Sequence, residues 1–251
     1  MKLLFRHAVT ACVAVAVSAP FWFGRLQWDP EMRLWRAIGD GSFVLLFFTL
    51  FLGPAARHWR PLVRLLPWRR ELGIWFAVLG LVHTLLVLDG WVRWDLMRFF
   101  GYEFIAQLGR YARLEPGFGL SNFVGIVAAA VSVPLMLTSS NWAVKRLGAS
   151  SWKWLHYGAY TVFFLVVLHT LYFLFVHFTV SFHRSVPDPN WFRYPFLVMA
   201  ALVLAVQASA FVATVRGRTV SGRGGQRRSN ASADPGDEVA GQSRAPDDDG
   251  G

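Results

Sequence analysis

The sequence predicts an all-α fold, a polytopic membrane bundle of about six transmembrane helices. Hydrophobic residues make up 55% of the 251 residues and charged residues only 16%, and the mean hydropathy is +0.39. These values are too apolar for an ordinary soluble domain. A helix needs roughly 20 mainly apolar residues to cross a hydrocarbon core of about 30 Å. About six such runs follow one another, so we expect an integral membrane protein.

The charge and the cysteine content exclude several classes of function. The net charge of +10 comes mainly from arginines in the connections between apolar runs, where they orient helices and contact anionic lipid. We therefore expect membrane lipid as a partner and no nucleic acid. Cys12 is the only cysteine, which excludes an intramolecular disulfide, and without a C-x-x-C-H motif the chain cannot attach a c-type haem.

The first two runs establish the orientation. Residues 3–23, with Lys2 and Arg6 at their start, are interpreted as a retained anchor rather than a cleaved signal peptide, and residues 41–56 form a second, shorter span. By the positive-inside rule the next connection is cytoplasmic, because it is rich in arginine and has no acidic residue. Its arginines are Arg57, Arg60, Arg64, Arg69 and Arg70.

The third and fourth spans are predicted at residues 71–91 and 121–138. The third then runs outward and the fourth inward. The connection between them, residues 92–120, carries charges of both signs and several aromatic residues, and it is long enough for an amphipathic helix at the outer interface.

The fifth and sixth spans are predicted at residues 152–178 and 195–215. From residue 216 the chain is rich in Gly, Ser, Arg and Asp, a composition that cannot bury enough apolar surface to fold. We therefore expect an N-terminal anchor and outer loop (1–37), a membrane domain (38–215) and a disordered cytoplasmic tail (216–251). Both termini are then cytoplasmic.

Two histidines lie deep within apolar runs. His83 is roughly 18 Å into the third span, and His169 lies in the fifth, which runs in the same direction. Two neutral imidazoles facing each other across a bundle suit axial ligation of haem iron, so we expect a haem site between helices three and five. Small residues such as Gly80 would leave room for the macrocycle, and Arg69 and Arg70 would neutralise its propionates.

His156 is harder to assign to this expected haem site. It precedes His169 by about 3.6 turns, so on an ideal helix the two side chains point roughly 140° apart. Both can face one partner helix only if the helix is kinked, overwound or bulged between them. His156 therefore serves a second or differently placed cofactor, or it donates a hydrogen bond.

Two non-redox interpretations remain as alternatives. A histidine in a membrane helix is often a hydrogen-bonded packing residue, so the protein could be a scaffold with structural histidines. A transporter with a proton-relaying histidine would show acidic residues within the spans and an internal repeat, and we find neither. The other histidines are expected at interfaces or on the surface; they are His7, His58, His177 and His183.

Two motifs carry a resemblance to a known family. Residues 137–169 read L-T-S, then R-L-G, then W-x-x-L-H-x-x-x-Y, with a second histidine at the end, and residues 68–83 read WRRELGIWFAVLGLVH. This pattern resembles the ferric reductase-like transmembrane domain family over roughly residues 38–178. Within the family it is similar to the haem-binding membrane subunit of bacterial methionine sulfoxide reductase systems.

The resemblance implies a b-type haem protein of the bacterial inner membrane. It implies an electron-transfer subunit without a complete catalytic site of its own, fed by a cytoplasmic flavin reductase and delivering electrons to a periplasmic molybdopterin reductase. The matching ligand positions are His83, His156 and His169. One haem b is expected, a second is left open, and FMN is a further candidate. A ferric or other metal reductase with a different acceptor is the alternative.

One position departs from the related oxidases and ferric reductases, which use two pairs of histidines. About four turns before His83, where a further histidine would stand, this chain has Arg69. His156 therefore has no evident partner for a second bis-histidine haem.

Overall fold

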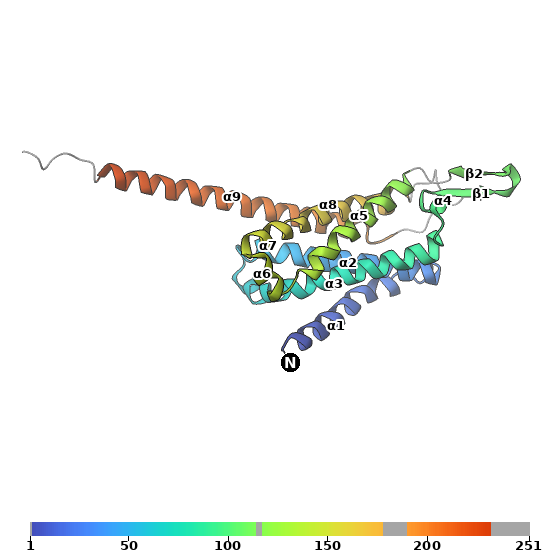
Figure 1. Ribbon diagram of the computed structural model, residues 1–251, viewed down its shortest axis with the longest axis horizontal. Helices are drawn as coiled ribbons and strands as arrows, with labels where there is room; N and C mark the ends of the chain where they lie inside the picture. Colours follow the sequence, from blue (N-terminus) through green and yellow to red (C-terminus); the bar gives the residue numbers. More distant parts are fainter. Residues whose placement is uncertain (1, 114–116, 178–189, 232–251) are drawn as a thin grey trace, which may run out of the picture. The chain divides into compact units, whose positions relative to one another are not determined.

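The computed structural model describes residues 2–113, 117–177 and 190–231, and this part of the chain is built mainly of helices (Figure 1). It contains six helical segments long and apolar enough to cross a membrane, which confirms the predicted polytopic helical fold. Helices dominate because backbone groups in hydrocarbon must bond within their own segment. The six spans are Leu3–Phe23, Pro30–Ala55, Arg60–Val92, Phe118–Leu137, Ala149–Val176 and Arg193–Arg216.

The spans are made of several shorter elements. The helices are α1 (Lys2–Phe23), α2 (Pro30–Ala55), α3 (Arg69–Val87), α4 (Leu96–Phe99), α5 (Phe118–Leu137), α6 (Asn141–Leu147), α7 (Ala149–His156), α8 (Gly158–Leu171) and α9 (Arg193–Ala231). The 3₁₀ segments are η1 (Arg60–Trp68) and η3 (Ala106–Leu108), and the π-helical segments are η2 (Leu88–Val92) and η4 (Tyr172–Val176). One antiparallel hairpin is formed by β1 (Tyr102–Ile105) and β2 (Arg110–Arg113).

The chain divides into two compact units, Met1–Gln207 and Ala208–Gly251. The first unit holds the bundle and the candidate site. The second consists, in its described part, of the later turns of α9 as far as Ala231.

Helix α2 lies at the centre of the bundle and packs against α1 and α3. Pro30 occupies its first turn, and the Asp29 side chain caps it by accepting hydrogen bonds from the backbone N–H groups of Glu31 and Met32. Its middle turns are apolar and buried, with Phe43 packing on Phe196 at a ring separation of 4.6 Å. This core holds α2 as a fixed wall for the neighbouring helices.

The second span begins at Pro30, well before the predicted start at residue 41. The early turns contain charged side chains, which made them look like a loop, but the fold gives these charges partners. Asp40 lies 2.6 Å from Arg25, and the Arg33 guanidinium lies 4.1 Å from the Trp22 ring. Ionic groups are tolerated at membrane depth when they are paired in this way.

The connection after α3 also differs from the prediction. Instead of an amphipathic helix, the chain forms η2, the single turn of α4 and the hairpin of β1 and β2. Arg93 and Trp94 adopt left-handed backbone conformations with φ of 53° and 55°, which turn the chain out of the α3 direction.

The predicted disordered tail begins at residue 216, whereas α9 continues as a helix through Ala231. Extending an existing helix adds one hydrogen bond for each residue fixed, so the apolar span can carry the helix past its own end. The rest of the predicted tail, residues 232–251, lies outside the described residues.

Candidate functional site

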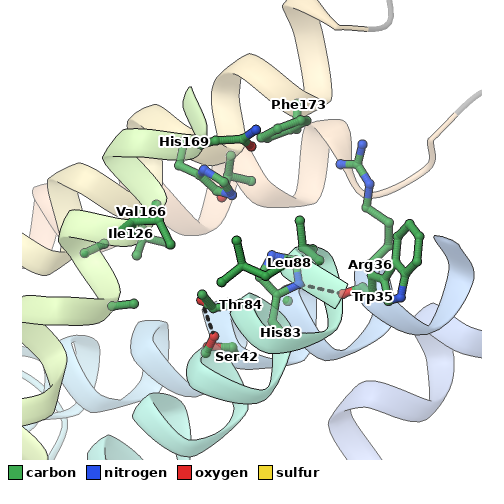
Figure 2. A pocket seen from close by; sticks show the side chains of 18 of the residues that line it. Trp35, Arg36, Ser42, His83, Thr84, Leu88, Ile126, Val166, His169 and Phe173 are labelled. Carbon is green, nitrogen blue, oxygen red and sulfur yellow. Dashed lines mark hydrogen bonds between the residues drawn. The ribbon is translucent and has the colours of Figure 1, made fainter. Parts of the chain in front are cut away.

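The two deep histidines come together between α3 and α8. His83 on α3 and His169 on α8 point toward each other, as Figure 2 shows, with ring centres 6.4 Å apart and ring planes at 79°. Helix α5 packs against both α3 and α8 and forms the third side of the space. The predicted meeting of these two residues is therefore present in the fold.

Each imidazole is held by a backbone carbonyl on a neighbouring helix. The Nδ1 atom of His83 lies 2.8 Å from the Trp35 carbonyl oxygen, and the Nδ1 atom of His169 lies 2.8 Å from the Ser121 carbonyl oxygen. A carbonyl oxygen can only accept a hydrogen bond, so the proton sits on Nδ1 of each neutral ring. This leaves a lone pair on each Nε2, the arrangement found in metal-ligating histidines with an oriented second nitrogen.

The separation of the rings fits two bonds to one metal ion. A bond from a transition metal to an imidazole nitrogen is about 2 Å, and each ring centre lies about 1 Å behind its nitrogen, so two opposed ligands place their ring centres roughly 6 Å apart. The observed 6.4 Å between His83 and His169 agrees with this value. No cluster of three or more His, Cys, Asp or Glu side chains able to hold a metal occurs in the described part of the chain. A planar cofactor that supplies its own equatorial ligands fits the pair better than a bare ion.

Two glycines make space behind the rings. A Cβ atom added at Gly39 on α2 would lie 3.0 Å from the His83 ring, and one at Gly125 on α5 would lie 2.8 Å from the His169 ring. Such contacts are too close for an ordinary side chain, so each imidazole reaches its position only because a glycine faces it. Gly80, expected to provide space, lines the same cavity.

The histidine pair faces a cavity whose wall is largely apolar, with a few polar side chains at defined places. The guanidinium of Arg36 lies 5.1 Å from the Phe173 ring and contributes a positive charge to the wall. Further polar lining residues are Asp40, Ser42, Thr84, Asn122, Ser132, Thr170 and His177. A flat apolar cofactor with acidic side groups fits this combination of an apolar wall, two imidazoles and an arginine.

Both histidine helices change to π-helix directly beyond the site. Segment η2 follows α3 and η4 follows α8, and Leu88, Val92 and Phe173 from these segments line the cavity. A π-turn adds a residue to the helical repeat and redirects the side chains, and it is often found at functional sites. Neither π-segment was expected from the sequence.

His156 lies elsewhere. It ends α7, its Nε2 is 3.2 Å from the Thr138 hydroxyl, and its ring stacks on Trp152 at 4.0 Å. The predicted long fifth helix is interrupted at Tyr157, so His156 and His169 both contact the α5 segment, His156 at its end and His169 near its start. His156 does not line the cavity that His83 and His169 share.

Arg69 and Arg70, which we expect to neutralise haem propionates, do not line the cavity. Arg69 donates from Nε to the Thr49 carbonyl at 2.9 Å, and Arg70 bonds Asn141 at 3.1 Å. Both stand at the start of α3, roughly 20 Å along the helix from His83. Within the part of the chain that the structure describes, Arg36 is the arginine in the cavity wall.

Four contributors were missed: Arg36, Gly39 and Asp40 of α2, and Gly125 of α5. The first three lie in turns of α2 that precede the predicted start of the second span at residue 41, so their closeness to His83 does not follow from the sequence. Asp40 is buried and paired with Arg25, so an acidic residue does lie within a span, contrary to the expectation. A helical periodicity check over residues 30–40 could have found the longer helix.

Fold and site together define a multi-pass helical membrane protein with a pair of opposed imidazoles in an apolar cavity. The family model "Ferric reductase like transmembrane component" matches residues 38–167. The chain therefore belongs to the ferric reductase-like transmembrane component family, as the motifs indicated.

Curated relatives are similar over most of their length. The chain is 30% identical over 217 residues to the protein-methionine-sulfoxide reductase heme-binding subunit MsrQ of Yersinia pseudotuberculosis, covering 82% of this chain and 94% of that protein. The protein of the same name from Yersinia pestis is also 30% identical, with 82% and 92% covered. No solved structure matches the chain significantly.

Proposed function

We propose that the protein is a b-type haem electron-transfer subunit, in which His83 and His169 would hold the haem iron. The observation that carries this is the opposed pair: two rings 6.4 Å apart, each with Nδ1 bonded to a carbonyl and Nε2 left available. The relatives named heme-binding subunits support the choice of cofactor. Bound haem would supply one-electron redox chemistry, which the protein would tune through the axial imidazoles and the apolar wall.

The protein's own residues would bind and orient the group. Trp35 and Ser121 carbonyls fix the two rings, Gly39 and Gly125 give them room, and Arg36 offers a charge to an acidic side group. If both His83 and His169 held the group, it would supply electron transfer rather than oxygen binding at this site.

The proposed direction of transfer follows from the arginine distribution. The ends of the bundle that carry Arg57 to Arg70 and Lys145 with Arg146 would face the cytoplasm. His83 and His169 then lie in the outer half, close to a periplasmic acceptor. We propose the bacterial inner membrane, cytoplasmic termini, a cytoplasmic flavin reductase as donor and a periplasmic molybdopterin methionine sulfoxide reductase as acceptor.

The arginines at the inner end of the bundle have a different proposed role from the histidine pair. Arg69 and Arg70 would meet anionic lipid or the phosphate of FMN there, rather than a haem propionate at the histidine pair. The proposal covers one haem b at that pair. A second haem would have to use His156, which lies at this inner end.

A reconstitution experiment tests the function. Protein purified with adequate haem and placed in vesicles should be red, with a Soret band that shifts when a flavin reductase, NADH and FMN are added on the side of the arginine-rich connections. Adding the oxidised molybdenum reductase on the other side should return the band to its oxidised position. A colourless preparation would overturn the haem assignment, and a haem that is reduced but never reoxidised would overturn the acceptor.

A further inference from the structure

The hairpin after α4 has one aromatic face. Its strands pair Tyr102 with Arg113, Glu103 with Ala112, Phe104 with Tyr111 and Ile105 with Arg110. Residues directly opposite each other in an antiparallel pair share a face, and neighbours along a strand alternate. Tyr102, Phe104, Tyr111 and Arg113 therefore form one face, here called the aromatic face. The opposite face carries Glu103, Ile105, Arg110 and Ala112.

The aromatic face is open in this chain. Phe104 is 58% exposed and Tyr111 46% exposed, and their rings contact each other edge to face at 5.4 Å. An isolated two-stranded hairpin is only marginally stable in water, and exposed aromatic side chains on it cover little surface of their own. A partner that covers this face would both stabilise the hairpin and bury the aromatic pair.

The base of the hairpin is attached to the wall of the histidine cavity. Phe99 of α4 lines the cavity, and its carbonyl accepts a hydrogen bond from the Asn122 side chain at 2.9 Å. The next residue, Phe100, lies so close to Gly119 that a Cβ added there would be 2.6 Å from the Phe100 ring. The hairpin is thus anchored on α5 beside the cavity, and a protein bound to it would stand near the proposed electron exit.

The direction of the hairpin distinguishes a soluble partner from a lipid surface. Figure 1 shows β1 and β2 continuing beyond the ends of α3 and α5, along the direction of those helices rather than across it. Strands that run on in the direction of the spans leave the headgroup layer for water, whereas a segment bound to headgroups would lie across it. This direction favours a soluble protein, rather than lipid, as the partner of the aromatic face.

The charge of this region indicates what kind of protein fits. Two of the nearby carboxylates are engaged within the chain, since Asp95 caps α4 and Asp89 accepts from the Trp94 indole. Arginine outnumbers acidic residues between positions 89 and 113, where Arg93, Arg98, Arg110 and Arg113 occur. Aromatic residues beside arginine are the side chains most enriched at binding hot spots.

We propose that the aromatic face is the docking surface for the soluble electron acceptor, a redox protein with an apolar patch bordered by acidic side chains. This rests on the proposed function, because it takes the acceptor from there. Arg113 supplies the charge within the contact, and Phe104 and Tyr111 supply its apolar centre. Opposite charges across an interface mainly raise the association rate, and salt weakens that effect.

The two arginines of β2 provide a matched test, because they lie on the same strand but on opposite faces. The haem-loaded full chain, reduced with dithionite, is mixed with the oxidised molybdenum methionine sulfoxide reductase of the same bacterium, and reoxidation is followed by stopped flow. Each event moves one electron from the reduced chain to the oxidised partner. We expect Arg113→Glu to lower the second-order rate at least tenfold at low salt, and Arg110→Glu to change it less than twofold.

The double variant Phe104→Ala with Tyr111→Ala should lower the rate as Arg113→Glu does, with an unchanged Soret band in every variant. Equal rates for the two arginine variants would overturn the docking surface while leaving the function in place. A wild-type chain that is red and reducible but not reoxidised by this reductase would remove the acceptor and the docking proposal together. A Phe104→Trp probe quenched by brominated lipid, and not shielded by the reductase, would assign the face to the membrane instead.

Discussion

Histidines at the two ends of the same bundle differ in which nitrogen they leave available. In the outer half, His83 and His169 donate from Nδ1 to backbone carbonyls, which leaves the lone pair on Nε2. At the other end, His156 engages Thr138 through Nε2 and stacks on Trp152.

The Thr138 hydroxyl decides the protonation of His156. Its oxygen lies 2.6 Å from the Pro134 carbonyl, which can only accept, so the hydroxyl hydrogen is used there. The same oxygen must then accept from the Nε2–H of His156. His156 therefore holds the opposite tautomer from the deep pair, and the comparison teaches that the hydrogen-bond partner, rather than depth in the membrane, decides which ring nitrogen carries the proton.

The largest expected effect comes from removing either member of the deep pair. His83→Ala and His169→Ala should each abolish the low-spin haem spectrum, because one axial bond and the enclosure of the cofactor are lost. Added imidazole should restore part of the band by filling the vacated position. His177→Ala is the matched control, since His177 lines the same cavity and its ring contacts Phe118 and Phe173, and its spectrum should stay that of the wild type. A normal band in either alanine variant of the pair would contradict the assignment.

The buried ion pair in the outer half should give the next effect. Asp40→Leu leaves Arg25, which is fully buried, without its partner carboxylate and should cost about 3–5 kcal/mol of stability. The double variant with Arg25→Met should recover most of this, because no uncompensated charge remains. Thermal unfolding in detergent measures both.

Asp29→Ala on the same helix is the control for the ion pair. It removes an exposed cap and should cost only about 1 kcal/mol. If Asp40→Leu proves no more damaging than Asp29→Ala, the ion pair is not what stabilises this part of α2.

A smaller effect is expected from the glycine behind His169. Gly125→Ala should displace that ring and weaken haem binding several-fold, because the new methyl group would lie 2.8 Å from it. Gly158→Ala on α8 is matched to it: both changes raise helix propensity by about 1 kcal/mol, but at Gly158 the nearest atom is 3.6 Å away. Haem titration of the two purified variants measures the difference, and equal affinities would show that the ring can shift without loss.

Much of this arrangement could be predicted from the sequence because periodic apolar runs determine the spans in a bilayer. The depth of His83 and His169 and the shared direction of their helices were enough to pair them. The charged turns of α2 could not be predicted as helix from the sequence. The free-energy cost of placing their charges in a membrane span is offset only by partners distant in the sequence. Arg25 lies on the connection after α1, and Phe173 lies in the π-segment after α8.

Arg69 and Arg70 show the same limit of prediction from sequence. Arg69 and Arg70 are expected to serve the haem because propionates favour arginine, yet they lie at the far end of α3 from the cavity. Sequence alone gives the position of a residue along its helix but not which neighbouring helix supplies the complementary charge. Arg36 reaches the cavity from α2, a helix that carries none of the predicted ligands.

The smallest expected effect is at the other end of the bundle, where His156→Ala should leave the low-spin signature of the deep pair unchanged. Its Nε2 is engaged by Thr138, and the histidine pair draws its support from Trp35 and Ser121 instead. Electron paramagnetic resonance of the oxidised protein, together with the ratio of haem to protein, separates the possible roles. An unchanged signature with a lower ratio would assign a second haem to His156, and loss of the signature itself would mean that the two ends are not independent.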